Sequence, residues 1–390
     1  MSAGCFDSWP RTLICGSGSS KTLGDKIKSM GKSKVIVITD EVMKDFPMVT
    51  DMVARFNSEG LTATLFGGIG PNPTDTQVMA CVEQMKKDQP EVIVCIGGGS
   101  PIDAAKAANV VYTHGGEVEE YDIAIGGIMR ITPKLLPFIC IPTTAGTGSE
   151  VTNVGVITNT KKHLKYGVLS PLLVPDISVL DAELTISLPA KVTANTGVDV
   201  LTHAIESYVS CHGFTVSEGL AYKAIKMVAK YLNTAVHDGK NLEARENMLE
   251  ASMMAGIAFN FNGLGLTHQM AHQLSAYFDL PHGLANAILL PHVMRFNLDA
   301  APEKFAAVAE ALGADINHMS VEEAAKKSIE LVEKLCKEVG IPKYLDEVGV
   351  TKDKVAAMAQ TALADPVGHG NPKQTTLAEC EQVFLNAFKN

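Results

Sequence analysis

Short apolar runs separated by amphipathic segments mark the first half of the chain. The runs are four to six residues long and hold β-branched residues, and the later two end at glycine or proline. Between them, segments such as Thr74–Lys87 and Pro101–Val111 repeat apolar residues at helical spacing. Buried apolar strands that alternate with helices predict a parallel α/β sheet. The predicted strands are Val35–Thr39, Leu61–Phe66, Val92–Ile96 and Phe138–Ile141.

The pattern changes around Pro175–Leu188. One last strand is predicted at Ile177–Leu180, after which helical periodicity dominates to the end. Because 390 residues exceed one ordinary core, we expect an α/β domain over residues 1–187 and an all-α domain over residues 188–390. The predicted helices are Lys191–Val209, Val216–Leu232, Leu242–Phe259, Pro302–Leu312, Val321–Val339 and Thr376–Phe388.

Composition narrows the possible partners and the compartment. A formal net charge of −10 disfavours nucleic acids and anionic membranes, and no segment approaches a membrane span. The N-terminus shows no signal peptide, which favours the cytoplasm. The cysteines are scattered without a C-x-x-C pair, so free thiols in a reducing compartment are expected. They are Cys5, Cys15, Cys81, Cys95, Cys140, Cys211, Cys336 and Cys380.

Two glycine-rich turns follow predicted strands. Gly97–Pro101 precedes a helix, where close backbone approach and unpaired N–H groups suit a phosphate. The second turn, Pro142–Glu150, offers hydroxyls that could bind ribose or pyrophosphate. Either could be a tight turn without a ligand, since Ser and Thr favour turns for local reasons. Together, at the carboxyl ends of strands of one sheet, they favour a dinucleotide site.

Asp40 stands directly after the first predicted strand. A carboxylate there can accept hydrogen bonds from the adenosine ribose and would repel a 2′-phosphate. A helix-capping or turn aspartate is the alternative.

Histidines and one aspartate form a second group of candidates. Asp199 and His203 are four residues apart, as are His268 and His272, and His282 lies in a turn flanked by proline and glycine. Spacing of four places two side chains on one helix face. Imidazoles and a carboxylate suit Zn²⁺ or Fe²⁺, although each histidine alone could be a packed core residue. Not all five can be ligands, because a catalytic metal keeps an open position.

Five collinear segments resemble the iron-containing alcohol dehydrogenase family, especially its lactaldehyde reductase and 1,3-propanediol dehydrogenase branch. The family has a dehydroquinate synthase-like architecture, with an α/β dinucleotide-binding domain and a helical domain. The segments cover nearly the whole chain in family order. They are GGGSPID, TTAGTGSEVT, TGVDVLTHAIESY, THQMAHQL and PHGLANAILLPHV.

The resemblance assigns roles residue by residue. It implies that His272 stays unligated beside the substrate. The implied metal ligands are Asp199, His203, His268 and His282. The implied NAD contacts are Asp40, Asn72, Gly98, Gly99, Ser100, Thr143, Thr144 and Lys165. Positions that differ from relatives or that could line the substrate pocket are Asn153, Phe259, Val367 and His369.

The expected activity is hydride transfer between NAD(H) and a small alcohol, diol or aldehyde. The expected cofactors are NAD and Fe²⁺, with Zn²⁺ possible, and the metal would polarise the aldehyde oxygen. His272 would relay the proton, since imidazole titrates near working pH. The resemblance suggests a homodimer or an assembly of dimers. Glycerol dehydrogenase-like, dehydroquinate synthase-like and non-enzymatic metal-binding functions stay open as alternatives.

Overall fold

The computed structural model describes residues 9–162 and 164–389. The chain divides into two compact units, each of which is described by itself. Of the described residues, one unit holds 9–144 together with 148–185, and the other holds 145–147 together with 186–389. Among the described residues, no helix is both long and apolar enough to cross a membrane.

The first unit is built on a parallel sheet with the strand order β1-β8-β5-β4-β2-β3. The predicted parallel α/β fold is therefore confirmed. Its central strands β2, β4 and β5 are buried almost throughout, as expected for strands covered on both faces. The strands are β1 (Thr12–Cys15), β2 (Lys34–Asp40), β3 (Thr62–Ile69), β4 (Val92–Gly97), β5 (Phe138–Pro142) and β8 (Ile177–Leu180).

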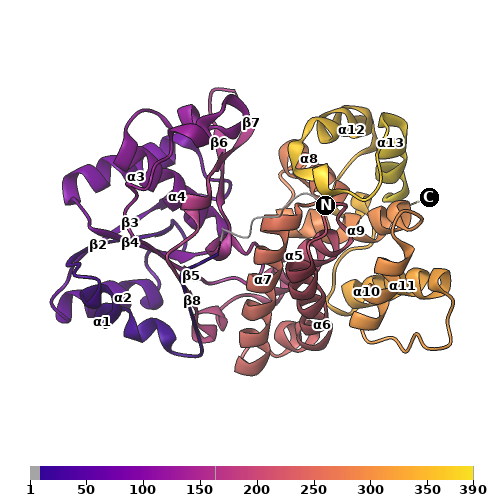
Figure 1. Ribbon diagram of the computed structural model, residues 1–390, viewed down its shortest axis with the longest axis horizontal. Helices are drawn as coiled ribbons and strands as arrows, with labels where there is room; N and C mark the ends of the chain where they lie inside the picture. The colour runs from indigo at the N-terminus through magenta and orange to yellow at the C-terminus, as the bar shows by residue number, and fades with distance from the viewer. Residues whose placement is uncertain (1–8, 163, 390) are drawn as a thin grey trace. The chain divides into compact units, whose positions relative to one another are not determined.

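Helices cover both faces of this sheet, and Figure 1 shows α1 and α2 on one side with α3 and α4 on the other. Successive side chains of a strand point to opposite faces, so Val35 and Val37 pack with α1 and α2, whereas Ile36 and Ile38 pack with α3 and α4. The helices are α1 (Leu23–Ser29), α2 (Pro47–Ser58), α3 (Asp75–Asp88) and α4 (Gly99–His114).

An antiparallel hairpin that was not predicted follows the second glycine-rich turn. It pairs β6 (Val154–Asn159) with β7 (Leu164–Leu169) and lies against α4. The predicted strands Val92–Ile96, Phe138–Ile141 and Ile177–Leu180 agree with β4, β5 and β8 to within one residue at each end.

The second unit is helical in its described residues, which confirms the predicted all-α character. Its apolar core gathers side chains from most of its helices, among them Val198, Leu201 and Ile205 on one stripe of α5. The helices are α5 (Ala190–Val209), α6 (Thr215–His237), α7 (Leu242–Asn262), α8 (Leu266–Phe278), α9 (His282–Asn297), α10 (Pro302–Ala311), α11 (Val321–Glu338), α12 (Val355–Ala364) and α13 (Leu377–Asn386).

Candidate metal centre and dinucleotide site

Helix α5 carries a second buried stripe, and this one is polar. Asp199, His203 and Glu206 recur at spacings of four and three residues and are 2%, 4% and 5% exposed. Burying polar groups costs free energy unless they find partners, so a polar stripe inside a helical core requires a matching group of donors and acceptors. The partners come from α8 and α9.

Helix α9 begins at His282, which the sequence had placed in a turn. The next residue, Gly283, lies close to α5: an added Cβ there would stand 2.6 Å from the backbone oxygen of Asn195. Any larger side chain would push the two helices apart. The glycine of the Pro-His-Gly motif therefore allows His282 to reach the polar stripe of α5.

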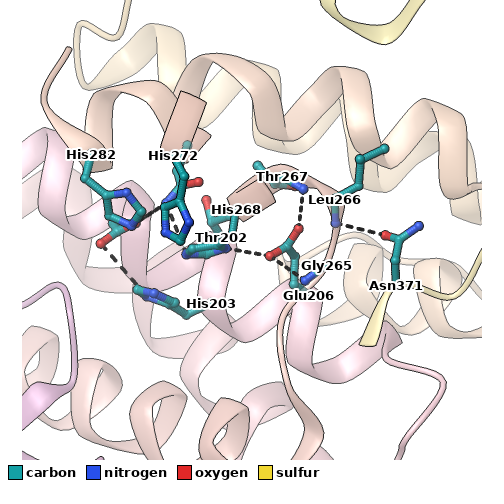
Figure 2. A network of polar contacts seen from close by, with 12 residues as sticks. Thr202, His203, Glu206, Gly265, Leu266, Thr267, His268, His272, His282 and Asn371 are labelled. Atoms are coloured by element: carbon teal, nitrogen blue, oxygen red, sulfur yellow. Dashed lines mark hydrogen bonds and ion pairs between the residues drawn. The ribbon is translucent and has the colours of Figure 1, made fainter. Parts of the chain in front are cut away.

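The four predicted metal ligands converge, and Figure 2 shows the three imidazoles turned toward one region. Asp199, His203, His268 and His282 each offer one ligand atom, and these atoms all lie within 4.8 Å of one another. The His203 ring stacks on the His268 ring at 4.6 Å, and the His268 and His282 ring centroids are 5.3 Å apart. Helix α5 and the consecutive helices α8 and α9 thus supply one compact donor set.

Three separate observations indicate that these donor atoms could hold a metal ion. The amide nitrogen of Asn286 donates to Asp199 Oδ1 at 2.7 Å and lies 3.1 Å from the Nε2 atoms of both His268 and His282, so three acceptor lone pairs point at nearly one place. His203 Nδ1 is buried without a hydrogen-bond partner among the described residues. Such an unpaired buried nitrogen is costly unless a further ligand completes it.

The third observation is electrostatic. Burial lowers the pKa of His268 and of His282 well below the ordinary imidazole value, so both rings are neutral at physiological pH. Neutral imidazole is the form that binds a metal. Three imidazoles with one carboxylate suit Fe²⁺ or Zn²⁺.

His272 is not part of this donor set, and its role as an unligated residue stays a prediction. Its ring centroid lies 5.4 Å from that of His282, and its side chain is 26% exposed. Its Nδ1–H donates to Asp365 Oδ2 at 2.7 Å. Because the carboxylate occupies Nδ1, the other ring nitrogen is left for proton exchange.

Three predicted dinucleotide segments lie at the carboxyl ends of neighbouring strands. Asp40 ends β2, the Gly97–Ser100 turn follows β4, and Thr143 and Thr144 follow β5. An added Cβ at Gly97 would stand 3.5 Å from Asp40 Oδ2, and one at Gly98 would stand 3.5 Å from Thr144 Oγ1. The structure therefore brings these segments together at the edge where open α/β sheets bind ligands.

The start of α4 suits a phosphate. The helix begins at Gly99, and its cap residue Gly98 supplies no side-chain acceptor for the first N–H groups. Uncapped N–H groups and the positive end of the helix dipole favour an anion. The adjacent Gly97 adopts φ 155°, a conformation that glycine permits.

The remaining dinucleotide candidates, Asn72 and Lys165, contact each other. Lys165 Nζ donates to Asn72 Oδ1 at 2.8 Å, and Asn72 adopts φ 53°, which is unusual for a residue with a side chain. Their roles toward NAD stay predictions.

The substrate-pocket candidates fall in different places. Phe259 stacks on His203 with ring centroids 4.7 Å apart, which puts it directly against the metal cluster. Val367 is half-buried and donates its N–H to Asp365 Oδ1. His369 is exposed and pairs with the ring of His212 at 5.5 Å, while Asn153 belongs to the α/β unit.

Three residues of the site were not predicted. Glu206 and Asn286 had a sequence signal, because each follows a candidate ligand, His203 or His282, by three or four positions on a helix. The pairing of Asp365 with His272 had no signal in helix spacing, since 93 residues separate the two.

The fold and site define a metal-dependent, dinucleotide-linked oxidoreductase, and comparisons with known proteins agree. Residues 10–182 match the family described as iron-containing alcohol dehydrogenase, and residues 193–388 match the C-terminal part of the same family. The chain is 39% identical to 1,3-propanediol dehydrogenase of Citrobacter freundii, over 97% of each chain. It is 37% identical to lactaldehyde reductase of Escherichia coli, over 97% of this chain and 98% of the relative.

Solved structures give the same result. A 1,3-propanediol oxidoreductase superposes with a TM-score of 0.96 at 38% identity, covering 99% of this chain and all of the other. The sulfoacetaldehyde reductase of Bifidobacterium kashiwanohense, solved with NAD⁺, gives 0.90 at 32% identity, with 99% of each chain covered. The chain belongs to the iron-containing alcohol dehydrogenase family. The predicted class, an NAD- and metal-dependent alcohol dehydrogenase or aldehyde reductase, is confirmed.

Proposed function

We propose that the protein interconverts short aldehydes and the matching primary alcohols or diols with NAD(H). The observation that carries this proposal is the buried convergence of Asp199, His203, His268 and His282 beside the unligated His272. The relatives named for propanediol and lactaldehyde support a substrate of about three carbons. Residues 1–187 would form the dinucleotide-binding domain and residues 188–390 the metal-binding catalytic domain.

Each unit would contribute a separate part of the chemistry. A bound Fe²⁺ or Zn²⁺ supplies a Lewis acid that polarises the carbonyl oxygen. The turns after β4 and β5 would hold the pyrophosphate and ribose of NADH, the hydride donor, through backbone N–H groups and hydroxyls. Asp40 would select NADH by bonding the adenosine ribose.

Proton transfer would fall to His272. Asp365 holds its Nδ1–H at 2.7 Å and so fixes the orientation and tautomer of the ring. With the ring protonated at both nitrogens, Nε2 would give its proton to the product oxygen during reduction, and the neutral ring would take a proton at Nε2 during oxidation. Phe259, stacked on His203, would form an apolar wall that favours small alkyl groups.

The test is a panel of short aldehydes, assayed by the loss of NADH absorbance. We expect steady turnover with at least one aldehyde of two to four carbons and weak turnover with glycerol-derived or bulky substrates. A lyase of the dehydroquinate synthase kind would turn over its substrate without net NADH consumption. Binding of metal without binding of NADH in a titration would favour a non-enzymatic metal-binding protein.

We also propose a homodimer, or an assembly of dimers, in a reducing cytoplasm. Apolar side chains are exposed around the β6–β7 hairpin, notably Ile125 at 67%, Met129 at 86% and Leu164 at 63%. Exposed apolar groups of this kind often mark association surfaces. Light scattering should give a multiple of the 41.5 kDa chain mass; a monomer would contradict the proposal of a homodimer.

The proposal of a reducing compartment is supported by the cysteines. The described cysteines are all free thiols, and Cys5 lies outside the described residues.

A further inference from the structure

The N-terminus of α8 is held by two side chains from distant parts of the chain. Glu206 accepts hydrogen bonds from the backbone N–H groups of Gly265 at 3.0 Å and Thr267 at 2.7 Å, and Asn371 Oδ1 accepts from that of Leu266 at 3.2 Å. Figure 2 shows the two side chains on either side of this helix start. First-turn N–H groups lack helical partners, so both side chains act as caps.

Glu206 makes one contact that Asn371 does not. Its Oε2 lies 2.6 Å from Nδ1 of His268, with the histidine 1% exposed and the carboxylate 5% exposed. The amide nitrogen of Asn286 lies 3.1 Å from Nε2 of the same ring and can only donate, so Nε2 is the acceptor and Nδ1 carries the proton that faces Glu206. The unprotonated nitrogen is then Nε2, which is the atom that lies 3.1 Å from the Asn286 amide among the converging acceptors.

This arrangement has little freedom to move. A Cβ added at Gly265 would stand 3.0 Å from Glu206 Oε1 and 2.9 Å from Asn371 Oδ1, so both caps approach a position that only glycine leaves open. The backbone at residues 265 and 267 and the imidazole of His268 therefore fix the carboxylate from three directions.

We propose that Glu206 is a positioning residue of the metal site, which selects the tautomer of His268 and aims its Nε2 at the ion. This inference rests on the proposed function, because it requires that the donor set hold a metal. Without the carboxylate, His268 can adopt the other tautomer, and its ring loses the contact that fixes its orientation. Losing such an outer carboxylate typically weakens metal affinity by about 10–100-fold.

Glu206→Gln tests the proposal, because it keeps the length of the side chain and removes its charge. The metal-free full-length protein is titrated with Co²⁺, whose visible absorption reports ligand geometry, and the dissociation constant is measured by competition with a chelator. We expect the constant to rise about 10–100-fold and the Co²⁺ bands to change. NADH affinity should match wild type, since the predicted dinucleotide residues lie in the other unit.

Asn371→Ala is the matched control, because it removes a cap from the same helix start without touching His268. It should lower the melting temperature while leaving Co²⁺ affinity and spectrum as in wild type. If it weakens Co²⁺ binding as much as Glu206→Gln does, helix capping explains the effect and the positioning role is wrong.

Gly265→Ala provides a second variant should Glu206→Gln fail to fold. The added methyl group displaces both the Glu206 carboxylate and Asn371 Oδ1 without removing either, so we expect Co²⁺ binding weaker than in Asn371→Ala. If a folded variant binds Co²⁺ with wild-type affinity, the inference about Glu206 is wrong, and the proposed function is unaffected. A wild-type protein that binds no Co²⁺, Fe²⁺ or Zn²⁺ would instead overturn the proposed function.

Discussion

The two carboxylate oxygens of Asp40 have different surroundings. Oδ1 accepts the N–H groups of Val42 and Met43, which closes the turn after β2. Oδ2 faces the glycine-rich turn at Gly97. The turn-aspartate reading and the ribose-binding reading of the sequence are thus compatible, because each uses a different oxygen.

Asp40→Asn should separate these two uses. The amide oxygen can still close the turn, whereas the negative charge that repels a 2′-phosphate is lost. We expect the preference for NADH over NADPH, measured as a ratio of kcat/KM values, to shrink by about 10–100-fold, corresponding to about 1.5–3 kcal/mol for a hydrogen bond to a charged group. A wild-type enzyme that uses NADPH more efficiently would refute the assignment.

His268 and His272 lie one helical turn apart and differ in their surroundings. The first is buried among the converging donors, and the second is bound to Asp365 at the margin of the cluster. His272→Ala should keep nearly stoichiometric metal and lower kcat by about 10²-fold or less, the usual scale of general acid–base assistance. His268→Ala should lose both metal and activity. The test measures metal content together with kinetics for both variants. If His272→Ala loses its metal while His268→Ala retains it, the two roles are reversed.

The site could be predicted from sequence to the extent that its members share a helix. Asp199 with His203, and His268 with His272, are visible as i, i+4 pairs. The meeting of α5, α8 and α9 is set by tertiary packing, including the close approach at Gly283, and spacing alone cannot show it. The partner of His272 was missed for the same reason.

At the scale of elements, the short 3-10 helix η5 (Ser149–Val151) holds a buried acid. Glu150 is 1% exposed, and its Oε1 has no hydrogen-bond partner among the described residues. Burial raises the pKa of Glu150 to about 7. The folded protein therefore keeps this proton to near-neutral pH, whereas the unfolded chain releases it near 4.5. The resulting stabilisation is full below the unfolded pKa and is lost as pH rises through about 7.

Glu150→Gln should flatten this dependence. From pH 5 to pH 8, the wild-type α/β unit should lose up to about 3 kcal/mol of unfolding free energy that the variant does not lose. Urea unfolding followed by the fluorescence of Trp9, the only tryptophan and part of this unit, gives the measurement. Asp25→Asn, at a side chain 92% exposed, is the control and should leave the wild-type profile unchanged. An identical profile in Glu150→Gln would contradict the assignment.

Two kinds of element were predicted to within one residue at each end. Strands β4 and β5 are buried at every position and read as apolar runs, whereas helix α11 has one buried face and shows a clear helical period. Helices α8 and α9 were not delimited, because buried polar residues such as His268 and Gln269, and Pro291 within α9, interrupt the apolar period. The edge strand β1 was not predicted; it is as short as β8, but none of its positions is buried.

At the scale of the whole molecule, the predicted activity needs both units. The α/β unit carries the residues predicted for NAD, and the helical unit carries the metal donors. The net charge of −10 does not oppose binding of an anionic dinucleotide, because backbone N–H groups at the start of α4 act locally. Neither unit alone should reduce an aldehyde.

The most direct test compares NADH oxidation by a short aldehyde before and after metal removal. Protein freed of metal with a strong chelator should retain NADH binding and lose aldehyde reduction, and Fe²⁺ or Zn²⁺ added back should restore turnover. An Asp199→Ala variant should stay inactive after the same addition, because it lacks one of the four donors. Full activity in protein shown by elemental analysis to be essentially metal-free would contradict the account.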